Sequence, residues 1–253
     1  MFADSSPPLQ PVAELDPGAL ALHPRLREKA VRDEHAELLR RRGWLRIESA
    51  LAPGLAAEIA ALLPGLSWTP QLDATRSALC WRCLVRMPST PEPQYPVCLY
   101  RLGRGLREEL PALVGELWGS PLELVTPTVP DHSGAQNGDA MLQDQAPLID
   151  FQVLRKGSYR ERLGSTVAAE VASIRFVFGL TGARWPRAWG GHLHLQTGDD
   201  LQVLPPGWDT LDLHGPVVTW SPLVTRHVWA PVVAGRLRNT ANETRAAPGS
   251  TDR

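Results

Sequence analysis

Residues 215–233 read GPVVTWSPLVTRHVWAPVV and contain two short apolar runs, Val217–Trp220 and His227–Val233, on either side of a proline-containing turn. Runs that are rich in Val and Trp and bounded by Gly or Pro are typical of β-strands. Four similar runs precede them: Ile149–Leu154, Ala172–Leu180, His192–Gln196 and Leu201–Leu204. The second half of the chain therefore predicts an antiparallel sandwich or a jelly roll.

The first half of the chain predicts helices that support this sheet. Three segments carry apolar residues at helical spacing: Arg25–Arg42, the segment that Ala52-Pro53 opens and that runs to Leu63, and Leu106–Trp118. Gly43 is a natural terminator for the first of them. Three short runs are β-like: Trp44–Ile47, Ala78–Val85 and Tyr95–Tyr100.

A chain of 253 residues is of ordinary size for one main domain. We predict that this domain spans residues 25–238. Residues 1–24 are rich in Pro, Ser and Ala and predict a flexible arm, and the polar residues 239–253 predict a disordered tail. Asp131–Gln145 predicts a long loop, which is either mobile or functional.

The composition narrows the class of partner. A formal net charge of -1 gives no field that favours nucleic acid or an anionic membrane, so a small-molecule partner is expected. Three cysteines are too few and too irregularly spaced for a disulfide framework. With no signal-peptide pattern at the start and no long apolar run, the sequence predicts a soluble, cytoplasmic protein.

Four segments occur in an order that carries further information: Leu38–Leu63, with its helix, Gly-Trp strand and Leu-x-Pro helix start; Val153–Tyr159, a strand and glycine turn; Ser173–Leu193, with Trp185 and Gly190-Gly191; and Gly215–Val232. Together they resemble the prolyl-hydroxylase-like branch of the iron(II)- and 2-oxoglutarate-dependent oxygenases. The resemblance covers about residues 35–238. It implies a mainly β fold, a double-stranded β-helix of the jelly-roll or cupin type with N-terminal supporting helices.

The resemblance also implies a metal site and a cosubstrate site. The family binds Fe(II) with a His-x-Asp pair and a distal histidine, which leaves open positions for 2-oxoglutarate and dioxygen. His227 occupies the place of the distal histidine. Arg236 and Arg238 follow it by nine and eleven residues, and either one is expected to bind the far carboxylate of 2-oxoglutarate.

The other half of the implied metal site is degenerate. Counting from the Gly157 turn, the His-x-Asp position falls on Leu163-Gly164-Ser165. Leucine offers no donor atom and serine is a poor iron ligand, so both Fe(II) and 2-oxoglutarate are in question. A shifted alignment through Tyr159 offers Glu161 as the carboxylate ligand, although tyrosine is an unusual ligand of Fe(II).

His192 and His194 are alternative ligands, because alternation along a strand places both on one face. Their apolar neighbours Leu193 and Leu195 favour a register in which the leucines point into the barrel and the histidines lie on the outer surface. In the opposite register the two histidines join His227 in a three-histidine metal site.

Other residues with reactive or polar side chains have simpler interpretations. Cys80 and Cys83 have C-x-x-C spacing, but no second pair completes a zinc site, so they predict half-buried strand cysteines. His214 is predicted to lie in a turn. His132 in the long loop and Trp81 are candidates for substrate contact.

Two functions follow from different classes of protein. The first is an iron(II)/2-oxoglutarate-dependent oxygenase that hydroxylates a small-molecule or amino-acid-like substrate, with missing ligands supplied by His192, His194 or Glu161. The second is a pseudoenzyme that lost the iron and kept its cavity for binding or assembly.

Overall fold

The computed structural model describes residues 19–72, 78–86, 94–125, 148–163, 173–182 and 184–240, and for residues 161–163 it describes the backbone alone. The predicted long loop, His132, Gly164, Ser165 and most of the two termini lie outside the described residues. No helix within the described ranges is both long and apolar enough to cross a membrane.

The helices form a compact layer on one side of the molecule. Their bounds are α1 Lys29–Arg42, α2 Leu55–Leu62, α3 Val97–Arg104 and α4 Leu110–Trp118, with a π-helical segment η4 Gly105–Glu109 and short 3-10 helices η2 Pro24–Arg27, η3 Leu63–Gly65 and η6 Arg187–Trp189. Helix α1 ends where predicted, because Gly43 adopts a left-handed conformation with φ 74° and its N–H donates to the carbonyl of Leu39.

The strands are β1 Trp44–Glu48, β2 Thr69–Leu72, β3 Ala78–Arg86, β4 Leu122–Val125, β5 Leu148–Leu154, β6 Tyr159–Leu163, β7 Ser173–Leu180, β8 Leu193–Thr197, β9 Asp200–Leu204, β10 Trp208–His214, β11 Val218–Ser221 and β12 Ala230–Asn239. Within the described residues they form one antiparallel sheet in the order β1-β10-β7-β12-β5-β3-β6-β11-β8-β9, with β2 on β3 and β4 on β12.

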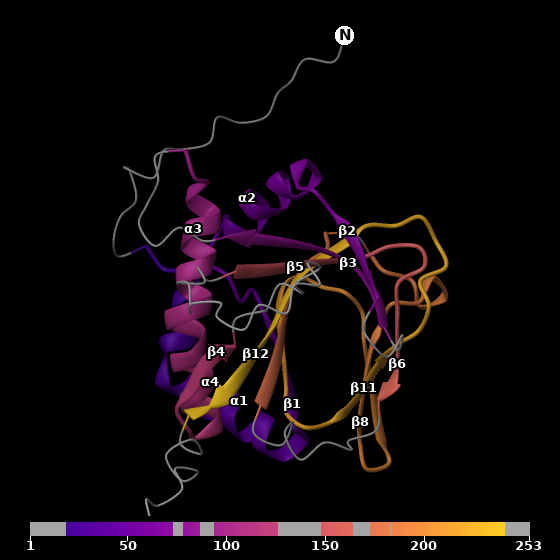
Figure 1. The fold of residues 1–253 in the computed structure, drawn as a ribbon. Helices are drawn as coiled ribbons and strands as arrows, with labels where there is room; N and C mark the ends of the chain where they lie inside the picture. Colours follow the sequence, from indigo (N-terminus) through magenta and orange to yellow (C-terminus); the bar gives the residue numbers. More distant parts are fainter. Residues whose placement is uncertain are drawn as a thin grey trace, which may run out of the picture.

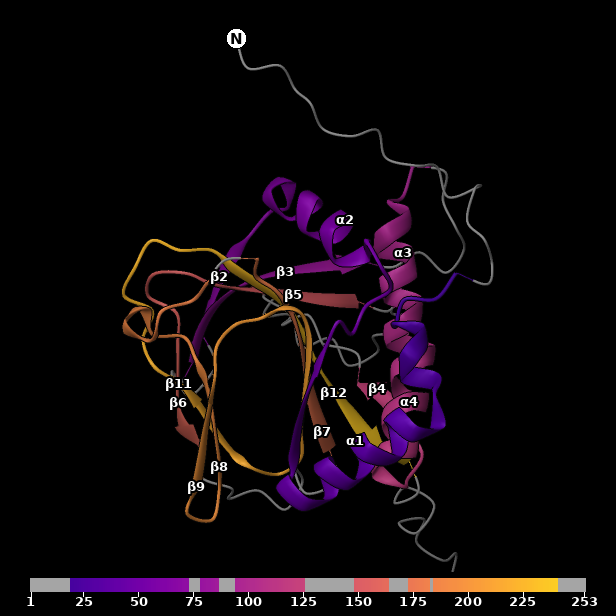
Figure 2. The same cartoon turned by 180° about the vertical axis from the view of Figure 1, so that it is seen from behind.

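The sheet curls so that its two ends enclose a space. Figures 1 and 2 both show β6, β8 and β11 on the side of the barrel that lies away from α1, α3 and α4. The larger layer, which packs against the helices, consists of β1, β10, β7, β12, β5 and β3 in sheet order. This alternation of antiparallel strands between two curled layers is the double-stranded β-helix that was expected from the sequence.

The main core lies between the helices and the outer face of the large layer. Phe151, Phe176 and Phe178 are fully buried there, together with leucines from all four α-helices. Because side chains alternate along a strand, Asp150 and Gln152, the neighbours of Phe151, point to the opposite face of β5. The large layer therefore has an apolar outer face and an inner face that carries polar side chains.

Several sequence predictions need correction at the level of single elements. Tyr95–Tyr100 is not a strand, because helix α3 begins at Val97. His214 is the last residue of β10 and is buried, whereas a turn position was predicted for it. The last strand begins at Ala230, so His227 precedes it in an irregular segment.

Candidate functional site

A cavity of about 650 Å³ lies between the two layers of the sheet. Its polar lining comes from strands of both layers: Gln71, Arg82, Asp150, Gln152, Tyr159, Arg160, Arg175, Asp212, His214, Ser221 and Arg236. A cavity of this size is in the range that holds small-molecule ligands and cofactors. It is the natural candidate for the binding site.

Three of the lining residues form a row across neighbouring strands. His214 on β10 is the register partner of Arg175 on β7, and Arg175 is in turn the register partner of Arg236 on β12. Directly paired residues of antiparallel strands project to the same face, with Cβ atoms about 4.5–5.5 Å apart. The row runs from Arg236, which is exposed, through the half-buried Arg175 to the buried His214.

His214 is the most enclosed polar group of the cavity, with 2% of its surface exposed. Burial, together with the smaller effects of the charges of Arg175 and Arg160, lowers the pKa of the imidazole to about 3. The ring is therefore neutral at physiological pH. Its Nδ1 is buried and has no hydrogen-bond partner in the described part of the chain.

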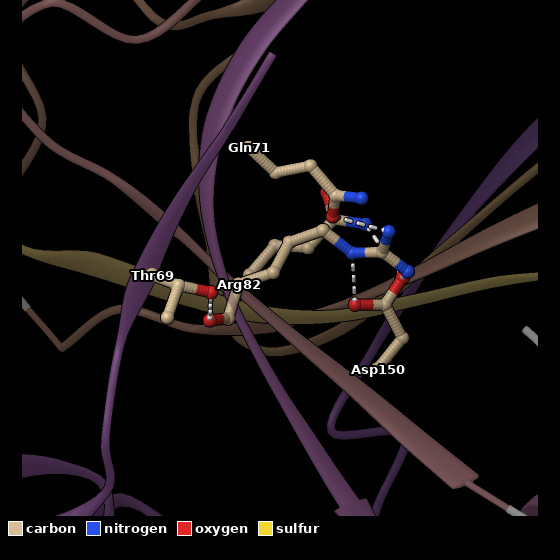
Figure 3. Close-up of polar contacts among 5 residues, drawn as sticks. Thr69, Gln71, Arg82 and Asp150 are labelled. Atoms are coloured by element: carbon tan, nitrogen blue, oxygen red, sulfur yellow. Dashed lines mark hydrogen bonds and ion pairs between the residues drawn. The ribbon is translucent and has the colours of Figure 1, made fainter. Parts of the chain in front are cut away.

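The carboxylate of Asp150 is already bound by an arginine of the neighbouring strand. Nε and Nη2 of Arg82 donate to its two oxygens at 2.8 and 2.7 Å, and Arg82 also contacts the amide oxygen of Gln71. Figure 3 shows the guanidinium between these two side chains, with the hydroxyl of Thr69 donating to the backbone carbonyl of Arg82. Gln152 completes the network by donating to Asp150 at 2.9 Å.

Asp212, the second carboxylate of the cavity, is bound in the same way. Nε and Nη2 of Arg46 donate to its two oxygens at 2.6 and 2.7 Å, and the same guanidinium donates to the carbonyl of Pro205 at 2.8 Å. Two-point pairs of this kind hold both partners in fixed positions. Each aspartate in the described lining is therefore paired with its own arginine, and three further arginines, Arg160, Arg175 and Arg236, also line the cavity.

The rest of the wall is apolar. Leu193 of β8 and Leu204 of β9 are register partners and line the cavity. Other apolar residues of the lining include Leu154, Val177, Pro205, Pro206, Val232 and Ala234. The cavity therefore combines two features. One is the row of Arg236, Arg175 and the neutral His214, which we call the cationic row, and the other is an apolar surface that suits the body of a ligand.

The expected His-x-Asp position begins at the end of β6. Leu163 there is the register partner of Thr219 on β11, and Thr219 is also the partner of Leu195 on β8. Thr219 is buried and shares its face of β11 with Ser221, which lines the cavity. At this level of the smaller layer the three neighbouring strands therefore carry Leu, Thr and Leu.

The structure does not place His227 in the cavity. Its side chain is exposed, and its Nε2 lies 3.4 Å from Nζ of Lys156, in the turn between β5 and β6. That turn and Leu163 are at opposite ends of β6. His227 and the expected His-x-Asp position are thus kept apart by the length of a strand.

His192 and His194 point away from the cavity, as in the first of the two registers considered, but they are not surface residues: His192 is buried, with 4% of its surface exposed, and His194 is half-buried. Leu193 between them lines the cavity, and the ring of His194 packs on Trp220 with centroids 4.9 Å apart. Burial lowers the pKa of both imidazoles below the ordinary value. Across the described ranges, no three His, Cys, Asp or Glu side chains are close enough to hold a metal ion; the side chain of Glu161 is not among those described.

The two candidate cosubstrate arginines have different environments. Arg236 lines the cavity, whereas Arg238 forms an ion pair with Glu123 of β4. Among the other candidates, Cys80 lines the cavity and Cys83 is a free, partly buried thiol. Trp81 packs against the guanidinium of Arg155, whose carbon lies 4.1 Å from a ring centroid.

Arg160, Arg175 and Thr219 were not predicted as site residues from the sequence. Arg175 sits within the apolar run SIRFVFGL, where it looks like an ordinary surface residue of a strand. Only its pairing with His214 and Arg236, which are far away in the sequence, shows its place in the cavity. The alternation of Arg175 with Ile174 and Phe176 was a signal that it points away from the core.

Comparisons with known proteins show which solved structures share this fold. No protein-family model matches the sequence, and no curated protein matches it either. Solved structures do match: a prolyl-4-hydroxylase from Pseudomonas putida is 11% identical with a TM-score of 0.56, covering 82% of this chain and 98% of that one. A Trichoplax adhaerens prolyl hydroxylase, in complex with a hypoxia inducible factor peptide fragment, is 11% identical with a TM-score of 0.58, covering 88% and 98%.

A third similar structure is HygX from Streptomyces hygroscopicus with nickel, 2-oxoglutarate and hygromycin B bound; it is 12% identical with a TM-score of 0.52, covering 82% of this chain and 87% of that one. Likeness at such low identity shows the fold. The resemblance found in the sequence is thus confirmed at that level: the chain has the double-stranded β-helix fold of the prolyl-hydroxylase-like iron(II)- and 2-oxoglutarate-dependent oxygenases.

Proposed function

We propose that this protein binds a small carboxylate ligand in the cavity of an oxygenase-type barrel and that it is a binding module without the iron site of that family. The observation that carries the proposal is the cationic row, in which Arg236 opens to solvent beside Arg175 and His214. A guanidinium binds a carboxylate through two parallel hydrogen bonds, so Arg236 is the expected anchor.

The donor set of the described residues supports ligand binding and does not fit iron. Fe(II) in this family needs two imidazoles and a carboxylate on one face. Within the described residues, the expected His-x-Asp position begins at Leu163, whose neighbours across the sheet are Thr219 and Leu195, and His227 is exposed at the other end of β6. 2-Oxoglutarate itself fits the cationic row, because either of its carboxylates can pair with Arg236.

In the proposed complex the protein orients the ligand and excludes water. Arg236 binds the carboxylate, and the two-point pairs of Arg82 with Asp150 and of Arg46 with Asp212 keep the inner faces of their strands in place. Neighbouring proteins of the same fold include ones solved with a small molecule or a peptide fragment bound. A small molecule fits the cavity described here better than an extended peptide, because the lining residues enclose a volume of about 650 Å³.

The second candidate function is an active oxygenase that hydroxylates a small-molecule or amino-acid-like substrate. The spacing of nine residues from His227 to Arg236 favours it, as does the position of Arg236 in the cavity. It requires a carboxylate such as Glu161, or ligands from outside the described residues, and a different position for the side chain of His227.

Calorimetry and a turnover assay separate the two functions. We expect 2-oxoglutarate to bind the wild-type protein without added metal, Arg236→Leu to lose about tenfold or more in affinity, and Arg238→Leu to bind normally. With Fe(II) and ascorbate present, no succinate is expected above the background of heat-denatured protein. Equal affinity of the Arg236→Leu variant would remove the proposal, and iron-dependent succinate release would establish the oxygenase.

A further inference from the structure

The cavity is larger than a five-carbon diacid requires, and only part of its wall is cationic. We propose that its ligand is a carboxylic acid with an apolar body, and that Arg175 and His214 select this class by binding the carboxylate together with Arg236. This inference rests on the proposed function and adds the chemical class of the ligand and two specificity-determining residues.

The first support is the arrangement of the row. His214, Arg175 and Arg236 come from three adjacent strands and face the same space. Because paired side chains are neighbours on one face of the sheet, a single carboxylate can accept hydrogen bonds from more than one of them. The exposure of Arg236 and the burial of His214 give the ligand an entry side and an inner end.

The second support is the unsatisfied nitrogen of His214. A buried polar atom without a hydrogen bond destabilises a fold, and such atoms are rare unless a ligand or water completes them. Nδ1 of His214 is one of these atoms within the described residues, and its ring lines the cavity. In the tautomer with a proton on Nδ1, a neutral imidazole donates to a carboxylate oxygen.

The third support is the charge around the imidazole. Arg175 approaches it from β7 and Arg160 from β6, and both act on it electrostatically. The nearest carboxylate along β10, Asp212, is held by Arg46. This environment disfavours a cationic ligand and favours an oxyanion at the inner end of the row.

The fourth support is the apolar wall. Leu193 and Leu204 form a paired surface on the smaller layer, and Leu154, Pro205 and Pro206 extend it. A ligand that consisted only of charged groups would leave this surface in contact with water. An aliphatic or aromatic body attached to the carboxylate would cover it, and the removal of this apolar surface from water would favour binding.

The test compares 4-phenylbutyrate with its uncharged amide, 4-phenylbutanamide, by calorimetry on the full-length protein. We expect the wild-type protein to bind the acid at least tenfold more tightly than the amide and more tightly than succinate. His214→Leu and Arg175→Leu should each weaken binding of the acid by about tenfold or more and leave the amide nearly unchanged. His214→Asn, which supplies an amide N–H near the position of Nδ1, should recover most of the affinity.

Thermal unfolding of each variant checks that it is folded, and the comparison of acid with amide in the wild-type protein needs no variant. Equal affinity for acid and amide would overturn the inference. So would full affinity of folded Arg175→Leu and His214→Leu. If acids bind and depend on Arg236 alone, the proposed function stands and only the role of Arg175 and His214 fails; if neither the acid nor 2-oxoglutarate binds, the proposed function fails as well.

Discussion

Leu163 of β6 and Thr219 of β11 lie directly opposite each other in the smaller layer of the sheet. Leu163 stands where the sequence pattern of the oxygenases places the first histidine of the metal site. The topology therefore makes Thr219, and not His227, the neighbour of that position. The two strands therefore keep their pairing in the sheet with a leucine and a threonine at this level.

The pairing predicts that a metal site can be built into the cavity. Residues directly opposite on antiparallel strands have Cβ atoms about 4.5–5.5 Å apart, which is close enough for two imidazoles to share one ion. The double variant Leu163→His/Thr219→His should bind Ni²⁺ at least tenfold more tightly than either single variant, measured by calorimetry. Double and single variants with the same affinity for Ni²⁺ would show that the two side chains do not face a common point.

Most of the fold could be predicted from the sequence, because the patterns that indicate strands and helices are local. The runs predicted as Ile149–Leu154, Ala172–Leu180 and Leu201–Leu204 match β5, β7 and β9 within one residue at each end. Strand β10 was missed because its sequence, WDTLDLH, mixes charged and apolar residues on a strand whose inner face is polar. The strand prediction for Tyr95–Tyr100 was wrong because a run this short has no clear period, and residues 97–100 form the first turn of helix α3.

The residues of the candidate site were harder to predict from the sequence, because strand pairing brings them together. Arg236 was named from its spacing to His227, and it does line the cavity. Arg175 and His214 could be recognised as site residues only from the strand order β10-β7-β12, which brings together residues that are far apart in the chain. The environment of His227 was equally beyond the sequence, since the chain turns at Arg226 and His227 before β12 begins.

The ion pair of Arg46 with Asp212 predicts a strong asymmetry between single and double substitutions. Arg46 and Asp212 have side chains that are 15% and 8% exposed, so removing the cation leaves a buried carboxylate without a partner. Arg46→Leu should lower the free energy of unfolding by about 3–5 kcal/mol, and the double variant Arg46→Leu/Asp212→Leu by less. Urea unfolding measures both.

The exposed pair of Arg40 with Glu37 is the control for this experiment, because both side chains are about two-thirds exposed. Arg40→Leu should change the free energy of unfolding by about 0.5 kcal/mol or less. A double variant as unstable as Arg46→Leu alone would show that the pair acts through packing and not through charge.

Gly190 predicts a large loss of stability on substitution by alanine. Its backbone has φ 77° and ψ -166°, a region that is almost restricted to glycine. A Cβ there would lie 2.0 Å from the carbonyl oxygen of Leu223. Gly190→Ala should therefore cost about 3 kcal/mol or more, whereas Gly65→Ala, which has open space around it, should be close to neutral. Comparable melting temperatures for the two variants would contradict this geometry.

The burial of His214 predicts a specific dependence of stability on pH. Its pKa is about 3 in the folded protein and 6.5 in the unfolded chain, so below pH 6.5 the unfolded state binds a proton that the folded state does not. Stability is then complete above pH 6.5 and is lost as the pH falls towards 3. Between pH 7 and pH 5 the wild-type protein should lose about 2 kcal/mol more than His214→Asn, measured by urea unfolding at each pH. Because the other histidines and all carboxylates are common to both proteins, a difference that stays constant with pH would mean that the imidazole of His214 is solvated or already charged, and its neutrality beside Arg175 and Arg160 would have to be given up.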